Sequence, residues 1–183
     1  MRSVSKVLPS VRFCLLVLLL SVSALMSAAE KMPNRSRSAK PGVMADHIIV
    51  VKSKHTMTLM QHDRVLKTYK VALGTVPVGA KQKHGDHKTP EGDYTINAKN
   101  AHSQFYLALR ISYPNAADRK RAHTLGVSPG GDIMIHGLMP EYAYLGALHR
   151  ETDWTDGCIA VTNQEIEEIW NLVPVGTKVE IRP

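Results

Sequence analysis

The sequence of 183 residues contains only two cysteines and few aromatic side chains. Two cysteines cannot form a disulfide framework, and they are too few for a four-cysteine zinc site. No cysteines and histidines have the spacing of a zinc finger, and the pattern H-E-x-x-H of metallopeptidases is missing. With 44% apolar and 21% charged residues, the composition is that of a globular protein. It excludes a disordered chain, a collagen and a multi-span membrane protein.

Acidic residues are absent from the first 29 positions. There, Arg2, Lys6 and Arg12 precede an apolar stretch over 13–26, which ends at the small residues 27–29. This order is typical of a secretory signal peptide, and we expect cleavage after Ala29. An uncleaved membrane anchor is the alternative, although the stretch is shorter than the roughly 20 residues that a membrane span needs.

The formal net charge of +7 suggests a polyanionic partner at first sight. Most of this charge lies near the N-terminus, because residues 1–29 carry +3 and residues 30–46 a further +2. Residues 30–46 are rich in Pro, Gly, Ser and Asn, so we expect a flexible linker. Residues 47–183 carry only +2 and have no aromatic platform for bases. A nucleic acid is therefore not an expected partner.

Residues 47–183 have mostly the periodicity of strands, with β-branched runs and alternation of apolar and polar residues. Between them, residues 74–90 are rich in Gly, Pro, His and Lys and predict a long loop. Residues 138–155 show no regular pattern. The predicted strands are 47–51, 56–60, 64–73, 92–97, 106–112, 132–136 and 177–181.

Two short helices are predicted among these strands. Asn115 can cap a helix over 115–123, and Thr162 with Glu165 forms a capping-box pattern before apolar residues at helical spacing. Pro174 follows the second helix. The sequence therefore predicts one mostly-β domain over 47–183, with one or two short helices and no second domain.

Cys158 is the only cysteine that remains if residues 1–29, which include Cys14, are removed. It is then an intermolecular bridge, a buried inert thiol or a reactive nucleophile. Gly157 permits a tight turn in which backbone N–H groups can stabilise an oxyanion during acyl transfer. His136, at the end of a predicted strand, can take the thiol proton if a third group orients its ring. These neighbours favour the nucleophile.

Four blocks of sequence together resemble a known family. In chain order they are Thr89-Pro90-Glu91-Gly92, Ile135-His136-Gly137, Thr155-Asp156-Gly157-Cys158 and VGTKVEI at 175–181. They resemble the L,D-transpeptidase (YkuD) catalytic domain and cover nearly all of 47–183. Glu91-Gly92 and Tyr113-Pro114-Asn115-Ala116 are similar to its YafK-like branch. The resemblance implies a β-sandwich or barrel-like fold.

The signal-peptide pattern predicts export to the periplasm or cell envelope, and we expect a monomer. The resemblance implies an enzyme that acts on peptidoglycan stem peptides without cofactor or metal. Cys158 matches the nucleophile that attacks the L-to-D bond of a tetrapeptide stem. His136 matches the proton donor and acceptor, and Gly137 the residue that orients it. The backbone of Gly157 and Cys158 matches the oxyanion hole. The acyl group then passes to an amine of a second stem, a D-amino acid or an envelope lipoprotein.

Two positions depart from the family pattern. Asp156 stands where a second histidine is usual, and Ala160 where Arg or Asn often follows. A carboxylate beside the thiol opposes thiolate formation unless it contacts His136 or solvent instead. Members of the similar branch hydrolyse peptidoglycan or its lipoprotein link. An L,D-carboxypeptidase or hydrolase with water as acceptor is therefore an alternative.

Two further classes remain open. His84 and His87, together with His136, suggest a zinc-dependent wall peptidase, although a polar, lysine-flanked loop explains the first two histidines more simply. A peptidoglycan-binding module without catalysis is the other class. It would need neither Cys158 nor His136, so their presence argues against it.

Overall fold

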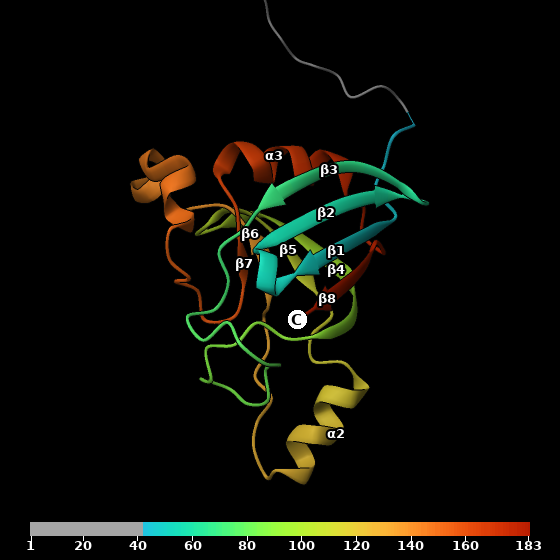
Figure 1. Cartoon of the computed structure of the whole chain (residues 1–183), viewed down its shortest axis with the longest axis vertical. Coiled ribbons are helices and arrows are strands. Elements are labelled where there is room, and N and C mark those ends of the chain that lie inside the picture. The colour runs from blue at the N-terminus through green and yellow to red at the C-terminus, as the bar shows by residue number, and fades with distance from the viewer. Residues whose placement is uncertain (1–41) are drawn as a thin grey trace, which may run out of the picture. The chain divides into compact units, whose positions relative to one another are not determined.

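A computed structural model describes residues 42–183. The predicted signal peptide and most of the predicted linker lie outside these residues. Eight strands form one curled sheet in the order β3-β2-β1-β8-β4-β5-β6-β7 (Figure 1). Their bounds are β1 His47–Val51, β2 Thr56–Gln61, β3 Arg64–Lys70, β4 Gly92–Ser103, β5 Tyr106–Ile111, β6 Met134–His136, β7 Ile159–Ala160 and β8 Lys178–Arg182.

The sheet nearly closes on itself. β1, β2 and β3 form an antiparallel meander, and β8 returns parallel to β1. β4, β5 and β6 are antiparallel, whereas β7 is parallel to β6. After leaving the edge strand β3, the chain crosses to the other edge, where Ala72 bridges Ala160 of β7 and Gly74 bridges Thr155. The mostly-β, barrel-like fold predicted from the sequence is confirmed.

Alternating side chains fill the interior of the curled sheet. Ile48 and Val50 of β1 are fully buried, as are Met57 and Leu59 of β2, while the residues between them are partly exposed. Side chains of a strand point to opposite faces in turn, so this pattern places one apolar face inward. Burial of each large aliphatic side chain contributes about 1.5–3 kcal/mol.

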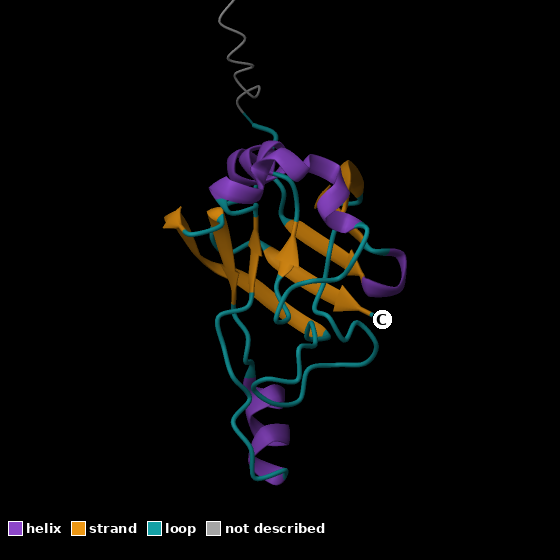
Figure 2. Cartoon of the chain, turned by 90° about the vertical axis from the view of Figure 1, so that its left-hand side faces the viewer, coloured by secondary structure: helices purple, strands orange, loops and turns teal. Residues whose placement is uncertain are grey.

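Both predicted α-helices are confirmed. α2 spans Ala116–Thr124 and α3 spans Asn163–Leu172, and each begins with a reciprocal capping box, at Asn115 and Thr162 respectively. α3 buries two isoleucines and packs against β5. Figures 1 and 2 show α3 beside the sheet and α2 projecting from the opposite end of this domain. Two 3-10 segments add to them, η1 (Lys52–Lys54) and η2 (Pro140–Arg150).

The structure differs from the predictions at several boundaries. β3 ends at Lys70 rather than at residue 73, and β4 continues to Ser103 because it pairs with β5 beyond a bulge. The domain also begins before residue 47, since Ala45 is buried and its N–H donates to the Leu172 carbonyl at 2.8 Å. Within residues 42–183, the helices are too short or too polar to span a membrane.

Lys52 anchors the long loop between β3 and β4. Its side chain is only 3% exposed. Its Nζ donates to the carbonyls of Gly79 (2.7 Å) and Thr89 (3.0 Å) and to Glu91 Oε1 (2.8 Å). A buried ammonium is stable only with such partners, and three charge-assisted hydrogen bonds satisfy its three donors. Lys52 therefore fixes the interior and the C-terminal end of the loop to the end of β1.

We expect Lys52→Met to lower the free energy of unfolding by about 2–4 kcal/mol, because it leaves a partly buried carboxylate and two carbonyls without their donor. Urea denaturation measures this change. Lys54→Met is the matched control, since Lys54 is exposed in the same segment. A Lys52→Met protein as stable as the control would contradict the anchoring role.

Candidate active site

The pairing of β6 with β7 brings His136 and Cys158 to the same place. Ile135 pairs with Ile159 and His136 with Ala160, in parallel register. Cys158 directly precedes β7. Because side chains alternate along a strand, Cys158 lies on the same face as Ala160 and therefore on the face of His136. Two residues that are 22 positions apart thus become neighbours on adjacent strands.

The imidazole of His136 is buried and neutral. It is 2% exposed, and its ring centroid lies 4.3 Å from that of Phe105 and 5.8 Å from that of Trp154. Its Nδ1 donates to the Gly137 carbonyl at 2.7 Å, which leaves the proton-accepting lone pair on Nε2. Burial lowers the pKa of His136 to about 4, against a smaller opposite effect of the Gly137 carbonyl.

Gly137 is required as glycine here. A Cβ at this position would lie 2.5 Å from Asn163 Oδ1 and 3.0 Å from Ile166 Cγ2. Asn163 Oδ1 in turn accepts from the Leu138 N–H at 2.6 Å. The start of α3 therefore packs closely against the segment that follows His136. The structure places Gly137 where the sequence resemblance puts the residue that orients the imidazole.

The Cys158 thiol is half-buried, with Sγ 3.6 Å from the Asp132 carbonyl. Burial raises the pKa of the thiol, and the nearby Asp156 raises it further. The Met134 N–H and the charge of Lys81 act in the opposite direction. Within residues 42–183, no hydrogen bond joins Sγ to the imidazole. The resting pair is therefore a neutral thiol and a neutral imidazole.

Thr155 shapes the turn that carries the nucleophile. Its hydroxyl donates to the Cys158 carbonyl at 2.8 Å and accepts the Gly157 N–H at 3.1 Å. The Gly157 N–H, one of the two predicted oxyanion donors, is therefore engaged within the turn in this structure. The Cys158 N–H has no partner among residues 42–183, so it is the donor of the predicted pair that can meet an oxyanion.

Gly157 itself meets a strict backbone requirement. Its φ is +120°, and a Cβ would collide with the Lys88 carbonyl. Only glycine adopts such a conformation readily. The long loop therefore lies directly against the turn before Cys158.

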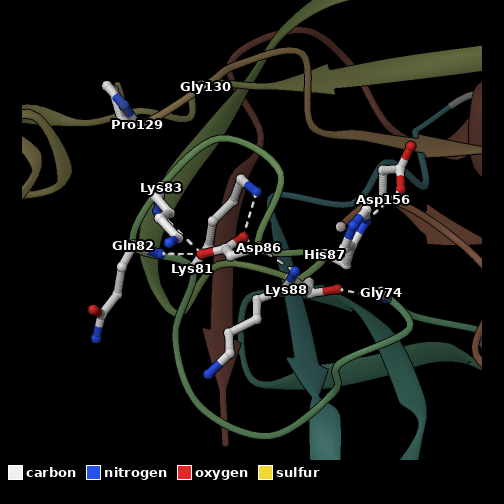
Figure 3. Close-up of polar contacts among 12 residues, drawn as sticks. Gly74, Lys81, Gln82, Lys83, Asp86, His87, Lys88, Pro129, Gly130 and Asp156 are labelled. Atoms are coloured by element: carbon white, nitrogen blue, oxygen red, sulfur yellow. Dashed lines mark hydrogen bonds and ion pairs between the residues drawn. The ribbon is translucent and has the colours of Figure 1, made fainter. Parts of the chain in front are cut away.

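A buried ion pair gives this loop its shape, as Figure 3 shows. Asp86 accepts from Lys81 Nζ at 2.7 Å and from the N–H groups of Gln82 (2.7 Å), Lys83 (3.0 Å) and Lys88 (3.2 Å). Burial opposes the charge of Asp86, yet these four donors bring its pKa to about 2. No sequence pattern indicated this pair, because polar residues of a loop have no periodicity.

The two loop histidines have different surroundings. His87 Nδ1 contacts Asp156 Oδ1 at 2.7 Å (Figure 3), whereas His84 lies against Gly130. Among residues 42–183, no three His, Cys, Asp or Glu side chains are placed to hold a metal ion. The zinc-peptidase alternative with His136 therefore gains no support from their placement. Asp156, the residue that departs from the family pattern, contacts the imidazole of His87 and not that of His136.

An apolar cavity of about 320 Å³ lies beside the buried imidazole. Trp154 contributes to its wall, and its ring also lies edge-on to that of His136. The irregular sequence of this segment predicted no such cavity, and η2 provides half of the lining residues. The lining residues are Leu138, Met139, Tyr142, Leu145, Leu148, His149, Thr152 and Trp154. Trp154 therefore lies between this cavity and the imidazole of His136.

Comparison with known proteins shows similarity to one family of enzymes. The family model of the YkuD L,D-transpeptidase catalytic domain matches residues 45–181. YafK of Escherichia coli (strain K12), named as a candidate L,D-transpeptidase, is 29% identical over 167 residues, which are 87% of this chain and 60% of that protein. YkuD of Bacillus licheniformis, named likewise, is 27% identical over 143 residues, 78% of this chain and 69% of that protein. The chain thus spans about 60% of the length of the first of these relatives.

Solved structures show the same fold. Pgp2 of Campylobacter jejuni, described as a helical cell shape determining protein, superposes with a TM-score of 0.57 at 23% identity, over 78% of this chain and 51% of that one. Bd1075 of Bdellovibrio bacteriovorus gives 0.54 at 21% identity, over 76% and 48% of the two chains. At these identities the likeness concerns the fold alone.

The lowered pKa of His136 predicts a loss of stability in acid. Unfolding exposes the imidazole, which then binds a proton near its ordinary pKa of 6.5, whereas the folded protein binds it only near 4. The stabilising contribution is present above pH 6.5 and is lost as the pH falls to 4; it amounts to about 3 kcal/mol at most. NMR titration of the His136 ring checks this. A midpoint near 6.5 would contradict it.

Proposed function

The chain belongs to the YkuD family of L,D-transpeptidase catalytic domains, and on this premise we propose that it is an exported cysteine acyltransferase acting on peptidoglycan stem peptides. The observation that carries the proposal is the parallel pairing of β6 and β7, which places the Cys158 thiol on the same face as the neutral His136 imidazole. A thiol with a purely structural role would not need an imidazole that can accept its proton. The signal-peptide pattern over residues 1–29 supports export, and we propose a monomer.

In the acylation half-reaction, His136 Nε2 takes the proton of Cys158 as Sγ attacks the carbonyl of the third stem residue. A C–S bond forms, and the oxyanion meets the Cys158 N–H. The C–N bond to the terminal D-residue then breaks, and its amine leaves with the proton from His136. The Gly137 carbonyl keeps Nδ1–H in place and stabilises the transient imidazolium.

Burial explains why general-base catalysis fits this site better than a preformed ion pair. It raises the pKa of Cys158 and lowers that of His136, so that both groups are neutral before substrate binds. Proton transfer from thiol to imidazole then occurs together with attack on the carbonyl. Without a substrate carbonyl to attack, the proton stays on the Cys158 thiol.

In the second half-reaction, an amine attacks the thioester and Cys158 is released. A second stem as acceptor gives a cross-link, and a D-amino acid or an envelope lipoprotein gives an attached group. With water as acceptor, the same acyl-enzyme makes the protein an L,D-carboxypeptidase, or a hydrolase of peptidoglycan or its lipoprotein link. The choice of acceptor separates these reactions, since the acylation step is common to all of them.

Intact-protein mass spectrometry with a disaccharide-tetrapeptide, with and without an amine, tests the proposal. We expect a Cys158 acyl adduct lacking the D-residue, and cross-linked or amine-extended product when amine is present. Cys158→Ala should form no adduct, and His136→Gln should acylate about 10²–10⁴-fold more slowly. The exposed His123→Gln is the matched control. Full turnover by Cys158→Ala would refute the mechanism.

A further inference from the structure

Two imidazoles flank the turn that carries the nucleophile, and the acylation mechanism uses only one. His136 is buried on β6, under Phe105 and Trp154. His87 approaches from the long loop, and half of its side chain is exposed. An acyl acceptor arrives from solvent after the first product has left. Of the two imidazoles, only His87 is open to solvent.

The backbone holds His87 firmly at this place. Its φ of +54° is unusual for a residue other than glycine. The Val76 N–H donates to its carbonyl at 3.1 Å, and Gly74 passes so close to that carbonyl that a Cβ would collide with it. The carbonyl of the next residue, Lys88, lies close against Gly157. His87 is thus positioned against the turn that leads to Cys158.

The side-chain partner of His87 gives it the form of a base. Nδ1 contacts Asp156 Oδ1 at 2.7 Å, and within residues 42–183 Nε2 has no hydrogen-bond partner. Figure 3 shows the imidazole turned toward Asp156, while Asp86 of the same loop turns toward Lys81. A carboxylate on Nδ1 fixes the proton there, leaves Nε2 free to accept another, and stabilises the imidazolium that results.

We propose that His87, oriented by Asp156, is the base for the acyl acceptor in the second half-reaction. The proposal rests on the proposed function, because it requires the Cys158 thioester. The nitrogen of the incoming amine forms a C–N bond with the acyl carbon, and the C–S bond breaks. His87 Nε2 takes the proton that the nitrogen loses, and the released thiolate later recovers a proton as His87 returns its own to solvent. His136 serves the acyl donor, and His87 the acceptor.

The assignment of the two half-reactions to different imidazoles gives Asp156 a role. Alone, its charge opposes formation of the Cys158 thiolate. Paired with His87, the same charge supports an imidazolium during attack by the acceptor. Asp156→Asn should therefore slow aminolysis of the thioester but should not slow acylation. A residue that merely held the turn in place would slow both steps when changed.

The experiment separates the two half-reactions in the full chain. The acyl-enzyme is formed with the disaccharide-tetrapeptide, and its formation and its loss to added glycine amide are each followed by intact-protein mass spectrometry. His87→Asn is the main variant, because asparagine tolerates a positive φ. His87→Gly removes the imidazole without backbone strain, so added imidazole can occupy its place. His84→Gln is the matched control in the same loop.

We expect His87→Asn to acylate within about twofold of the unaltered protein and to lose aminolysis by about 10²-fold. Imidazole should accelerate aminolysis by His87→Gly in proportion to its concentration, and should leave the His84→Gln rate unchanged. Unchanged aminolysis in His87→Asn would overturn the inference. So would an equal loss of both steps without rescue by imidazole. Failure of the unaltered protein to form an acyl adduct is a different result, and would overturn the proposed function itself.

Discussion

The parallel pairing of β6 and β7 is the contact on which the site depends. The two strands are only three and two residues long, so their own hydrogen bonds cannot hold them together. β5 supports β6 from one side, and Ala72 pairs with Ala160 of β7 from the other. Ile135 and Ile159, fully buried, fill the core behind them. The closure of the curled sheet therefore fixes the register that sets thiol beside imidazole.

Burial at this contact controls the chemistry. It disfavours charge on both partners, so the pKa of His136 falls and that of Cys158 rises. Folding then buries no uncompensated ion. A thiol that stays protonated also reacts slowly with oxidants. In the proposed mechanism, the thiol proton therefore moves to the imidazole only when a bound substrate is attacked.

Local patterns predicted most of the fold, because strands and capped helices are determined by neighbours in the sequence. A β-branched run located β1, alternation located β2, and Thr162 with Glu165 located the start of α3. The proposed nucleophile Cys158 and the proposed base His136 were predicted from their sequence neighbours and the four ordered blocks. Contacts between distant loop residues carry no such pattern. Lys52, the pair of Lys81 with Asp86, and the contact of His87 with Asp156 became visible only in three dimensions. The engagement of the Gly157 N–H by Thr155 was missed for the same reason, since it depends on the side-chain rotamer in a turn.

The central claim is that thiol and imidazole rest as a neutral pair and that His136 acts as a general base. The pH dependence of Cys158 alkylation by iodoacetamide tests this most directly, since only the thiolate reacts. The account predicts a rate that rises steadily and reaches half its maximum above pH 9.0, the ordinary pKa of the thiol. A plateau of fast alkylation extending down to about pH 6 would show a preformed thiolate–imidazolium pair and would contradict the account.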